Sequence, residues 1–392
     1  MSEGTEREPI SVARRVRETP PSGIRRFFEI AEELDDVISL GVGEPDFTAP
    51  PRARDAAVDS LERGRTSYTA NRGMAQLREA IAAHAGKWDL DYDADEEVLV
   101  TAGASEAIDL TFRALVDPGD VVAVGQPSYV SYVPGVRFAG GEPLPVPTYA
   151  EDQFRLTPER LDEAGASEAD LLVLCYPNNP TGATMSREDL GRVAEYAKRH
   201  DLTVLSDEIY ADLTYEREHT SIASLPGMRE RTVVYNGFSK AYAMTGLRLG
   251  YALGPATAID AMNRVHQYTM LSAPTTAQYA AVEALRSCDD AVEEMRDAYD
   301  RRRRFLLARF EEMGVDCFEA TGAFYAFPAV PGPYDDAGTF AEDLLEAERV
   351  AMVPGTAFGA GGEGHLRVSY ATGLDDLREA ADRLERFLAD VR

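Results

Sequence analysis

The feature that most constrains the fold is a short apolar run at residues 171–176, LLVLCY, which ends in a proline-rich turn. A half-exposed strand alternates apolar and polar residues, whereas this run is continuous. It therefore predicts a strand buried on both faces, central in a parallel sheet. Similar short runs at 98–101, 121–124, 203–206 and 232–235 predict further strands.

Lysine placement gives the first indication of chemistry. Only three of the 40 Lys and Arg residues are lysines, at positions 87, 198 and 240. Lys87 and Lys198 have polar neighbours and are predicted to be solvated, whereas Lys240 closely follows the apolar run 232–235. A lysine held in a partly desolvated pocket can lose its proton and form a Schiff base, which an arginine cannot do. Lys240 is therefore the candidate nucleophile.

Polar groups follow the other predicted strands, at the ends where open α/β sheets bind ligands. The small-residue turn 103–105 precedes a helix, whose first N–H groups and dipole favour a phosphate. The turn 177–182, PNNPTG, presents side-chain amides. Asp207 directly follows the strand 203–206, and strand alternation directs the side chain of Glu208 to the opposite side from that of Asp207. Tyr129 follows another strand, either directed outward by Pro127 or packed in the core.

The segment around Lys240, NGFSKAYAMTGLRLGY, resembles the cofactor-lysine segment of the class I and II aminotransferases, subgroup I-gamma in particular. The motifs GEPDF at 43–47, PNNPTG and RVSYA at 367–371 occur in family order, so the resemblance spans nearly the whole chain. It implies the α/β fold of pyridoxal 5′-phosphate (PLP) fold type I. A mainly parallel, seven-stranded sheet would form a large domain, 45–286, and the segments 1–44 and 287–392 would form a smaller α+β domain.

The resemblance also implies roles for individual residues. Lys240 would hold PLP as a Schiff base and move the substrate proton. Asp207 would keep the pyridine ring protonated, which makes it the better electron sink, and Tyr210 would bind the phenolic oxygen. The other implied cofactor ligands are Gly103, Ala104, Ser105, Tyr129, Asn179, Ser239, Arg248 and Tyr68, the last reaching the phosphate of the other subunit's cofactor. The implied substrate ligands are Gly43, Asn179 and Arg367.

Two positions need comment. Some relatives carry a hydroxyl residue three positions before the lysine, where this chain has Gly237, so Ser239 is expected to supply the hydroxyl. Arg367 lies in an apolar strand, where an unpaired guanidinium is costly to bury. It needs an anion, either in a structural salt bridge or from a substrate carboxylate held by two parallel hydrogen bonds. The resemblance favours the substrate.

The implied activity is transfer of the amino group of an L-amino acid to 2-oxoglutarate. Residues 265–285 contain no lysine or arginine, which favours an aromatic donor, although subgroup relatives recognise aspartate by other routes and aspartate stays open. A PLP-dependent C–S lyase is the alternative, because a shared fold does not decide which bond breaks. A non-catalytic PLP-binding regulator ranks last, since the chain is too acidic for a DNA-binding partner.

Composition limits the partners. The formal charge of −28 argues against binding to nucleic acid or an anionic membrane. An acidic, lysine-poor chain suggests adaptation to concentrated salt, which screens self-repulsion. The polar N-terminus and the absence of long apolar runs predict a cytoplasmic protein, and the role implied for Tyr68 predicts a homodimer with shared active sites. The three cysteines and five histidines show no metal-ligand spacing, so no metal site is expected.

The remaining predictions concern secondary structure. An amphipathic helix is expected at 24–31, and an alternating strand at 248–253. The charged stretch 289–313 predicts a solvated helix that bridges the two domains. Beyond it, strands are expected at 315–319, 323–327 and 365–369, with a helix near 340–348.

Overall fold

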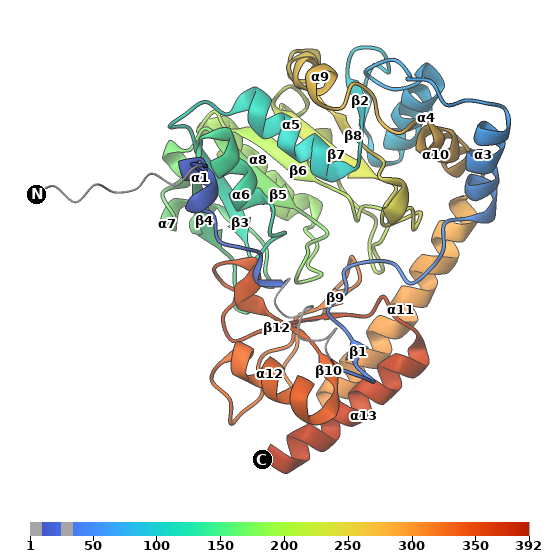
Figure 1. The fold of residues 1–392 in the computed structure, drawn as a ribbon. Helices are drawn as coiled ribbons and strands as arrows, with labels where there is room; N and C mark the ends of the chain where they lie inside the picture. Colours follow the sequence, from blue (N-terminus) through green and yellow to red (C-terminus); the bar gives the residue numbers. More distant parts are fainter. Residues whose placement is uncertain (1–9, 25–33, 392) are drawn as a thin grey trace, which may run out of the picture.

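The computed structural model describes residues 10–24 and 34–391, and its centre is a seven-stranded sheet (Figure 1). The spatial order is β2-β8-β7-β6-β5-β3-β4. Within this sheet β8 alone runs antiparallel to its neighbours. The predicted mainly parallel α/β sheet is therefore confirmed. The strands are β2 (Val98–Thr101), β3 (Val121–Gln126), β4 (Glu142–Pro147), β5 (Leu171–Cys175), β6 (Thr203–Asp207), β7 (Thr232–Gly237) and β8 (Gly250–Leu253).

The apolar run that predicts a doubly buried strand is β5, which pairs with β3 on one side and β6 on the other. Leu171 and Val173 pack with α5 (Ala104–Leu115), α6 (Tyr132–Ala139) and α9 (Ala256–Thr269). Leu172 and Leu174 pack on the opposite face with α7 (Pro158–Glu163) and α8 (Arg187–Arg199). Both faces are covered by helices, which is why the run cannot alternate.

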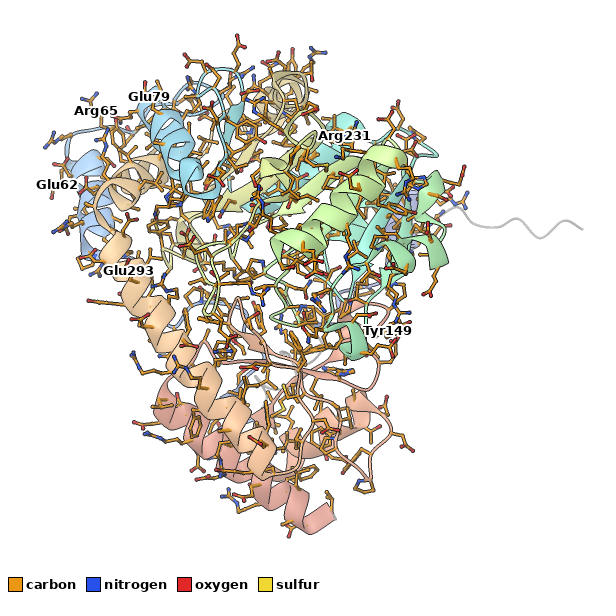
Figure 2. All side chains as sticks on the ribbon, turned by 180° about the vertical axis from the view of Figure 1, so that it is seen from behind. Glu62, Arg65, Glu79, Tyr149, Arg231 and Glu293 are labelled. Carbon is orange, nitrogen blue, oxygen red and sulfur yellow. The ribbon has the colours of Figure 1, made fainter. Side chains whose placement is uncertain are left out.

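A third group of helices covers the β2 and β8 end of the sheet. These are α3 (Pro51–Glu62), α4 (Ala75–Ala85) and α10 (Thr275–Ser287), which pack around the apolar side chains of β2 and β8. Their outer faces carry acidic residues, and Figure 2 shows Glu62 and Glu79 pointing outward from α3 and α4. Acidic charge is thus placed where water can solvate it.

The smaller part of the molecule joins the two ends of the chain. β1 (Ile38–Ser39) pairs in parallel with β10 (Val350–Ala351). A second sheet has the order β11-β12-β9, formed by Val353–Pro354, Leu366–Ser369 and Tyr325–Ala326. The flanking helices are α12 (Ala337–Glu348) and α13 (Leu374–Val391), and α1 (Arg14–Arg17) lies against α6. Apart from α1, which packs on the large part through α6, these elements form the expected α+β part, and the exact boundaries at 44/45 and 286/287 stay predictions.

The long helix α11 (Asp289–Glu312) runs from the large sheet to the smaller part (Figure 1). It bridges the two parts as the sequence predicts, but it is solvated on one face only. One face buries Met295, Tyr299, Arg303 and Leu306, while residues such as Glu293 point outward (Figure 2). Sequence patterning does not reveal this buried stripe, because one of its residues, Arg303, is charged and the rest of the helix is rich in charged residues.

Two strand predictions also need correction. Residues 315–319 form only an isolated bridge, from Cys317 to Pro328, and β9 contains two residues because Ala323 has a φ of 56° outside the extended region. β8 begins at Gly250 and is wholly buried, so it does not alternate, and Arg248 lies before it with a φ of 51°. The predicted helix 24–31 lies outside the described residues except for Ile24.

No helix within residues 10–24 and 34–391 combines the length and apolar character that crossing a membrane would require. Cys175, Cys288 and Cys317 are free thiols, and the first two are buried.

Candidate active site

A cavity of about 370 Å³ lies at the carboxyl ends of the central strands, between the large sheet and the smaller part. Most of the predicted site residues line it. They are Gly43, Ala104, Ser105, Tyr129, Asn179, Asp207, Tyr210, Ser239, Lys240, Arg248 and Arg367. Gly103 does not line the cavity, but it packs against the guanidinium of Arg248, which does. Tyr68 is 79% exposed and is not among the residues that line the cavity.

Lys240 follows β7, whose six residues are all buried. Its Nζ donates a hydrogen bond to the Gly43 carbonyl oxygen at 2.6 Å and lies 5.9 and 5.7 Å from the ring centres of Tyr210 and Phe324. Burial lowers the pKa of Lys240 to about 8, although the nearby Glu44 carboxylate opposes this. A far larger fraction of this amine is therefore uncharged near neutral pH than for a solvated lysine.

Asp207 is the last residue of β6 and points into the cavity. Its Oδ2 accepts a hydrogen bond from the Tyr132 hydroxyl at 2.6 Å, and its Oδ1 accepts one from the Ile209 N–H at 3.2 Å. Burial raises the pKa of Asp207 to about 6, although these donors lower it. The carboxylate is thus placed to stabilise a cation beside it.

Glu208 points to the other side of β6, as strand alternation predicts. Its Oε1 accepts hydrogen bonds from Ser206 and Ser221, and its Oε2 lies 2.8 Å from His219 Nε2. Glu208 does not line the cavity. It ties the loop after β6 to the strand.

The Arg248 guanidinium lies against the first turn of α5, where the two could hold an anion. A Cβ on Gly103 would lie 2.8 Å from Arg248 Nη2, and one on Gly250 would lie 2.4 Å from the Ala104 nitrogen. Glycine at both positions therefore lets the guanidinium and the β8 backbone approach the helix N-terminus, where N–H groups and the dipole favour a phosphate. Gly250 is a residue that the sequence analysis missed.

The same packing accounts for Gly237. A Cβ there would lie 2.9 Å from Gly250 Cα and 3.0 Å from the Leu249 carbonyl oxygen. A hydroxyl residue does not fit at this position without movement of β8. Ser239 lines the cavity instead.

Arg367 projects from β12 and is only 3% exposed. Its Nη1 donates to Asn179 Oδ1 at 3.1 Å, and its Nη2 donates to the Gly41 carbonyl oxygen. Its Nε has no partner, and no carboxylate forms an ion pair with it, within the described part of the chain. Burial lowers the pKa of Arg367. The cavity thus contains a buried cationic fork without an anion.

Two further residues were missed by the sequence analysis. The Tyr132 hydroxyl donates a hydrogen bond to Asp207. The sequence signal that could have identified Tyr132 was its position three residues after Tyr129. The Tyr325 hydroxyl lies 2.9 Å from the Tyr210 hydroxyl. A Cβ on Gly43 would lie 2.7 Å from the Tyr325 hydroxyl. Only the fold brings Tyr325 into the site, because it lies 115 residues from Tyr210.

The family model for "Aminotransferase class I and II" matches residues 35–384. The chain belongs to the class I and II aminotransferases. It is 43% identical to an aspartate aminotransferase of Pyrococcus abyssi, over 95% of this chain and 97% of the relative. It is 40% identical to aromatic-amino-acid aminotransferase 2 of Thermococcus litoralis, over 98% of this chain and the whole of that one.

A solved structure gives the same result for the fold. The aspartate aminotransferase of Thermus thermophilus with maleate superposes with a TM-score of 0.91 and is 41% identical, covering 96% of this chain and 99% of its own. The enzyme is therefore a transaminase of PLP fold type I. Class I and II aminotransferases depend on PLP, so this is its cofactor.

The aminotransferase cavity fits PLP on its own geometry. A cradle for the phosphate lies between Arg248 and α5, a buried carboxylate is available for the ring nitrogen at Asp207, and a lysine with a lowered pKa is available for the aldehyde. Asn179 uses its Oδ1 for Arg367, which leaves its Nδ2 to donate to the phenolic oxygen.

Proposed function

We propose that this aminotransferase takes the amino group of an aromatic L-amino acid and passes it to 2-oxoglutarate. The supporting observation is the charge of the cavity wall. Within the described residues three cations line it, Lys240, Arg248 and Arg367, and each already has a task. The remaining wall is largely aromatic and aliphatic, with Tyr129, Tyr132, Tyr325, Ile24, Ile108 and Ile209. Such a wall suits an apolar side chain.

We propose the following roles for the chain's own residues. Arg367 holds the substrate carboxylate with its two terminal nitrogens, helped by Asn179 and the loop at Gly43. Bound PLP supplies the aldehyde that receives the amino group and a ring that stabilises charge at Cα. Lys240 takes the proton from the substrate Cα and returns it to the cofactor, as a base and then an acid.

Three residues orient the ring. Asp207 would face its nitrogen and favour the protonated ring, and Tyr210 would donate to its phenolic oxygen. Tyr129 packs against the ring face, and it is itself held edge-on by Tyr132 at a centroid distance of 5.6 Å and 81°. Ser105, Ser239 and Arg248 bind the phosphate.

Aspartate is the second candidate donor, because an aspartate aminotransferase is among the relatives. A second carboxylate would need another cation, supplied by a partner subunit or by the part of the chain outside the described residues. The two donors therefore need different groups beside the substrate side chain: apolar residues for an aromatic donor, and a further cation for aspartate.

Absorbance changes of the PLP-loaded enzyme in concentrated KCl separate these candidates. The enzyme is mixed in single turnovers with phenylalanine, tyrosine, aspartate, alanine or cysteine. Conversion of the cofactor band, fastest with phenylalanine or tyrosine, supports the proposal, and fastest conversion with aspartate replaces it. Ammonia release from cysteine without band conversion would instead indicate a C–S lyase.

Lys240→Ala should lower the rate of amino transfer at least about 10⁴-fold, because both the covalent link and the proton carrier are lost. Lys198→Ala is the matched control, since Lys198 lies on the outside of α8 and bonds to Glu195. Turnover at the unmodified rate in Lys240→Ala would disprove its assignment.

We further propose a homodimer with shared active sites, in which Tyr68 reaches the partner's phosphate. The loop that carries Tyr68 is joined to the segment after α9, because Asn71 donates to the Leu271 carbonyl oxygen and Thr275 donates to the Ser67 carbonyl oxygen. Tyr268 and Met270 at the end of that helix are 86% and 47% exposed, respectively. Large exposed apolar side chains on joined segments favour a subunit interface there.

Mixed dimers test this arrangement. In a hybrid of Lys240→Ala and Tyr68→Ala subunits, one site carries both changes and the other carries neither. Activity should therefore reappear when the two inactive variants are mixed. No recovery, or a monomer by light scattering, would contradict the shared site.

We also propose a cytoplasmic location. The charge of −28 supports one more proposal, a requirement for concentrated salt. Removing salt should unfold the protein by unscreening its acidic surface. The unfolding midpoint measured from 0.1 to 3 M KCl, with about 0.1 M as the weakly screened limit, should rise with salt. A flat dependence would show that the acidic composition has no such role.

A further inference from the structure

Tyr210 and Tyr325 form a pair of buried phenols in the cavity wall. Their hydroxyl oxygens lie 2.9 Å apart, and their rings meet edge to face at 5.9 Å and 82°. Each phenol has a single proton to donate. One of the two must therefore donate to the other, and the direction decides which proton remains free for a ligand.

The surroundings determine the direction. The Arg367 guanidinium lies 4.8 Å from the Tyr325 ring centre and favours negative charge on that phenol. Burial raises the pKa of both phenols, and the charge of Arg367 opposes this at both. At Tyr325, whose ring Arg367 covers, that charge is the largest opposing effect, whereas at Tyr210 it is smaller than the effect of Tyr325. Tyr325 is therefore the stronger donor of the pair.

We propose that Tyr325 is a positioning residue whose hydroxyl donates to the Tyr210 oxygen and thereby commits the Tyr210 proton to the phenolic oxygen of PLP. The inference rests on the role proposed above for Tyr210. It adds a residue on β9, from the smaller part of the molecule, that adjusts the cofactor through a second side chain. Without Tyr325, Tyr210 is a weaker and less directed donor.

The loss of this hydrogen bond can be measured by titrating the bound cofactor. A donor to the phenolic oxygen stabilises the negative charge left when the Schiff base of Lys240 loses its proton. Weakening that donor therefore raises the pKa of the cofactor's absorbance change. We expect Tyr325→Phe to raise it by about 0.5 to 1, the size expected for one neutral hydrogen bond.

The test is a spectrophotometric pH titration of the holoenzyme and four variants. Tyr210→Phe should raise the pKa more than Tyr325→Phe does. The double variant should match Tyr210→Phe alone, because Tyr325 acts only through Tyr210. Tyr299→Phe is the matched control, since Tyr299 is equally buried, contacts Phe324 and has a hydroxyl without a partner in the described residues. It should leave the pKa unchanged.

Two outcomes would overturn the proposal. One is an unchanged pKa in Tyr325→Phe. The other is a double variant that shifts well beyond Tyr210→Phe, which would mean that Tyr325 acts by general distortion. Failure of the proposed function looks different, because the unmodified protein would then show no cofactor band or no amino transfer.

Discussion

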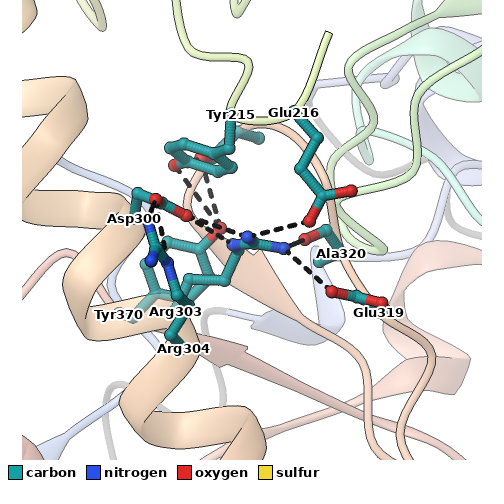
Figure 3. A network of polar contacts seen from close by, with 9 residues as sticks. Tyr215, Glu216, Asp300, Arg303, Arg304, Glu319, Ala320 and Tyr370 are labelled. Atoms are coloured by element: carbon teal, nitrogen blue, oxygen red, sulfur yellow. Dashed lines mark hydrogen bonds and ion pairs between the residues drawn. The ribbon is translucent and has the colours of Figure 1, made fainter.

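Two buried arginines in this molecule face opposite circumstances. Arg303 on α11 and Arg367 on β12 are each 3% exposed. Figure 3 shows Arg303 surrounded by acceptors. Its Nε bonds to Asp300, its Nη1 to the Ala320 carbonyl oxygen and its Nη2 to Glu216. Arg367 has an amide, a carbonyl and a nitrogen without a partner. The first charge is balanced by the fold, and the second needs a ligand to balance it.

The largest effect should come from Arg367→Met. Loss of the carboxylate fork should lower kcat/KM about 10³-fold, equivalent to about 4 kcal/mol. The free energy of unfolding should change by less than about 1 kcal/mol, because the fold supplies no carboxylate that the substitution would leave unpaired. Steady-state kinetics and denaturation in KCl measure the two quantities. A loss of stability larger than the loss of transition-state binding would invalidate the comparison.

Arg303→Met should behave in the reverse way. It removes the cation that Asp300 and Glu216 share, so the free energy of unfolding should fall by about 3 kcal/mol. This is the low end for a broken buried pair, because Glu216 is half exposed and Asp300 keeps its ion pair with Arg304. The KM for the amino donor should change little. Thermal and denaturant unfolding test this, and equal destabilisation by Arg303→Met and Arg367→Met would refute the distinction.

Lys240 sharpens the comparison, because it is a buried cation that can shed its charge. Its pKa is lowered to about 8, so the free amine increases as pH rises toward that value. The rate at which apoenzyme captures PLP should rise about tenfold per pH unit below about 8 and level off above it. Stopped-flow absorbance measures this rate. A rise that continues to pH 10 would mean that burial does not depress the pKa.

The smallest effect should come from Tyr132→Phe. Asp207 then keeps only the Ile209 N–H as a donor, so its pKa rises above about 6 and the ionised carboxylate is lost at a higher pH. The acid limb of the kcat/KM profile should move to higher pH. The binding free energy of PLP at neutral pH should weaken by about 1 kcal/mol. An unshifted limb would show that the hydroxyl does not stabilise the carboxylate.

Much of the site was predictable because its residues follow strand ends. Lys240, Asp207 and Asn179 each come just after a continuous apolar run, and parallel strands bring such ends to one edge. Alternation alone separates Asp207 from Glu208. Arg367 was detectable because a charge in an apolar strand demands an anion.

The rest depends on contacts between distant segments. Tyr325 reads as an ordinary strand residue until β9 is placed beside Tyr210, and Gly250 reads as a spacer until β8 crosses the start of α5. The buried face of α11 was hidden because Arg303 gains two of its partners, Glu216 and the Ala320 carbonyl oxygen, from other segments. Local pattern cannot supply such pairings.

The loop after β1 has a consequence for affinity. Its carbonyl oxygens at Gly41 and Gly43 accept hydrogen bonds from Arg367 and Lys240, respectively. The backbone thus occupies the same donors that a substrate carboxylate and the cofactor aldehyde require. With the roles proposed for Arg367 and Lys240, binding becomes an exchange in which ligand atoms displace peptide oxygens, and only the difference between the two sets of bonds contributes to affinity. The protein's own backbone thus does for these two side chains what water does for an exposed cation.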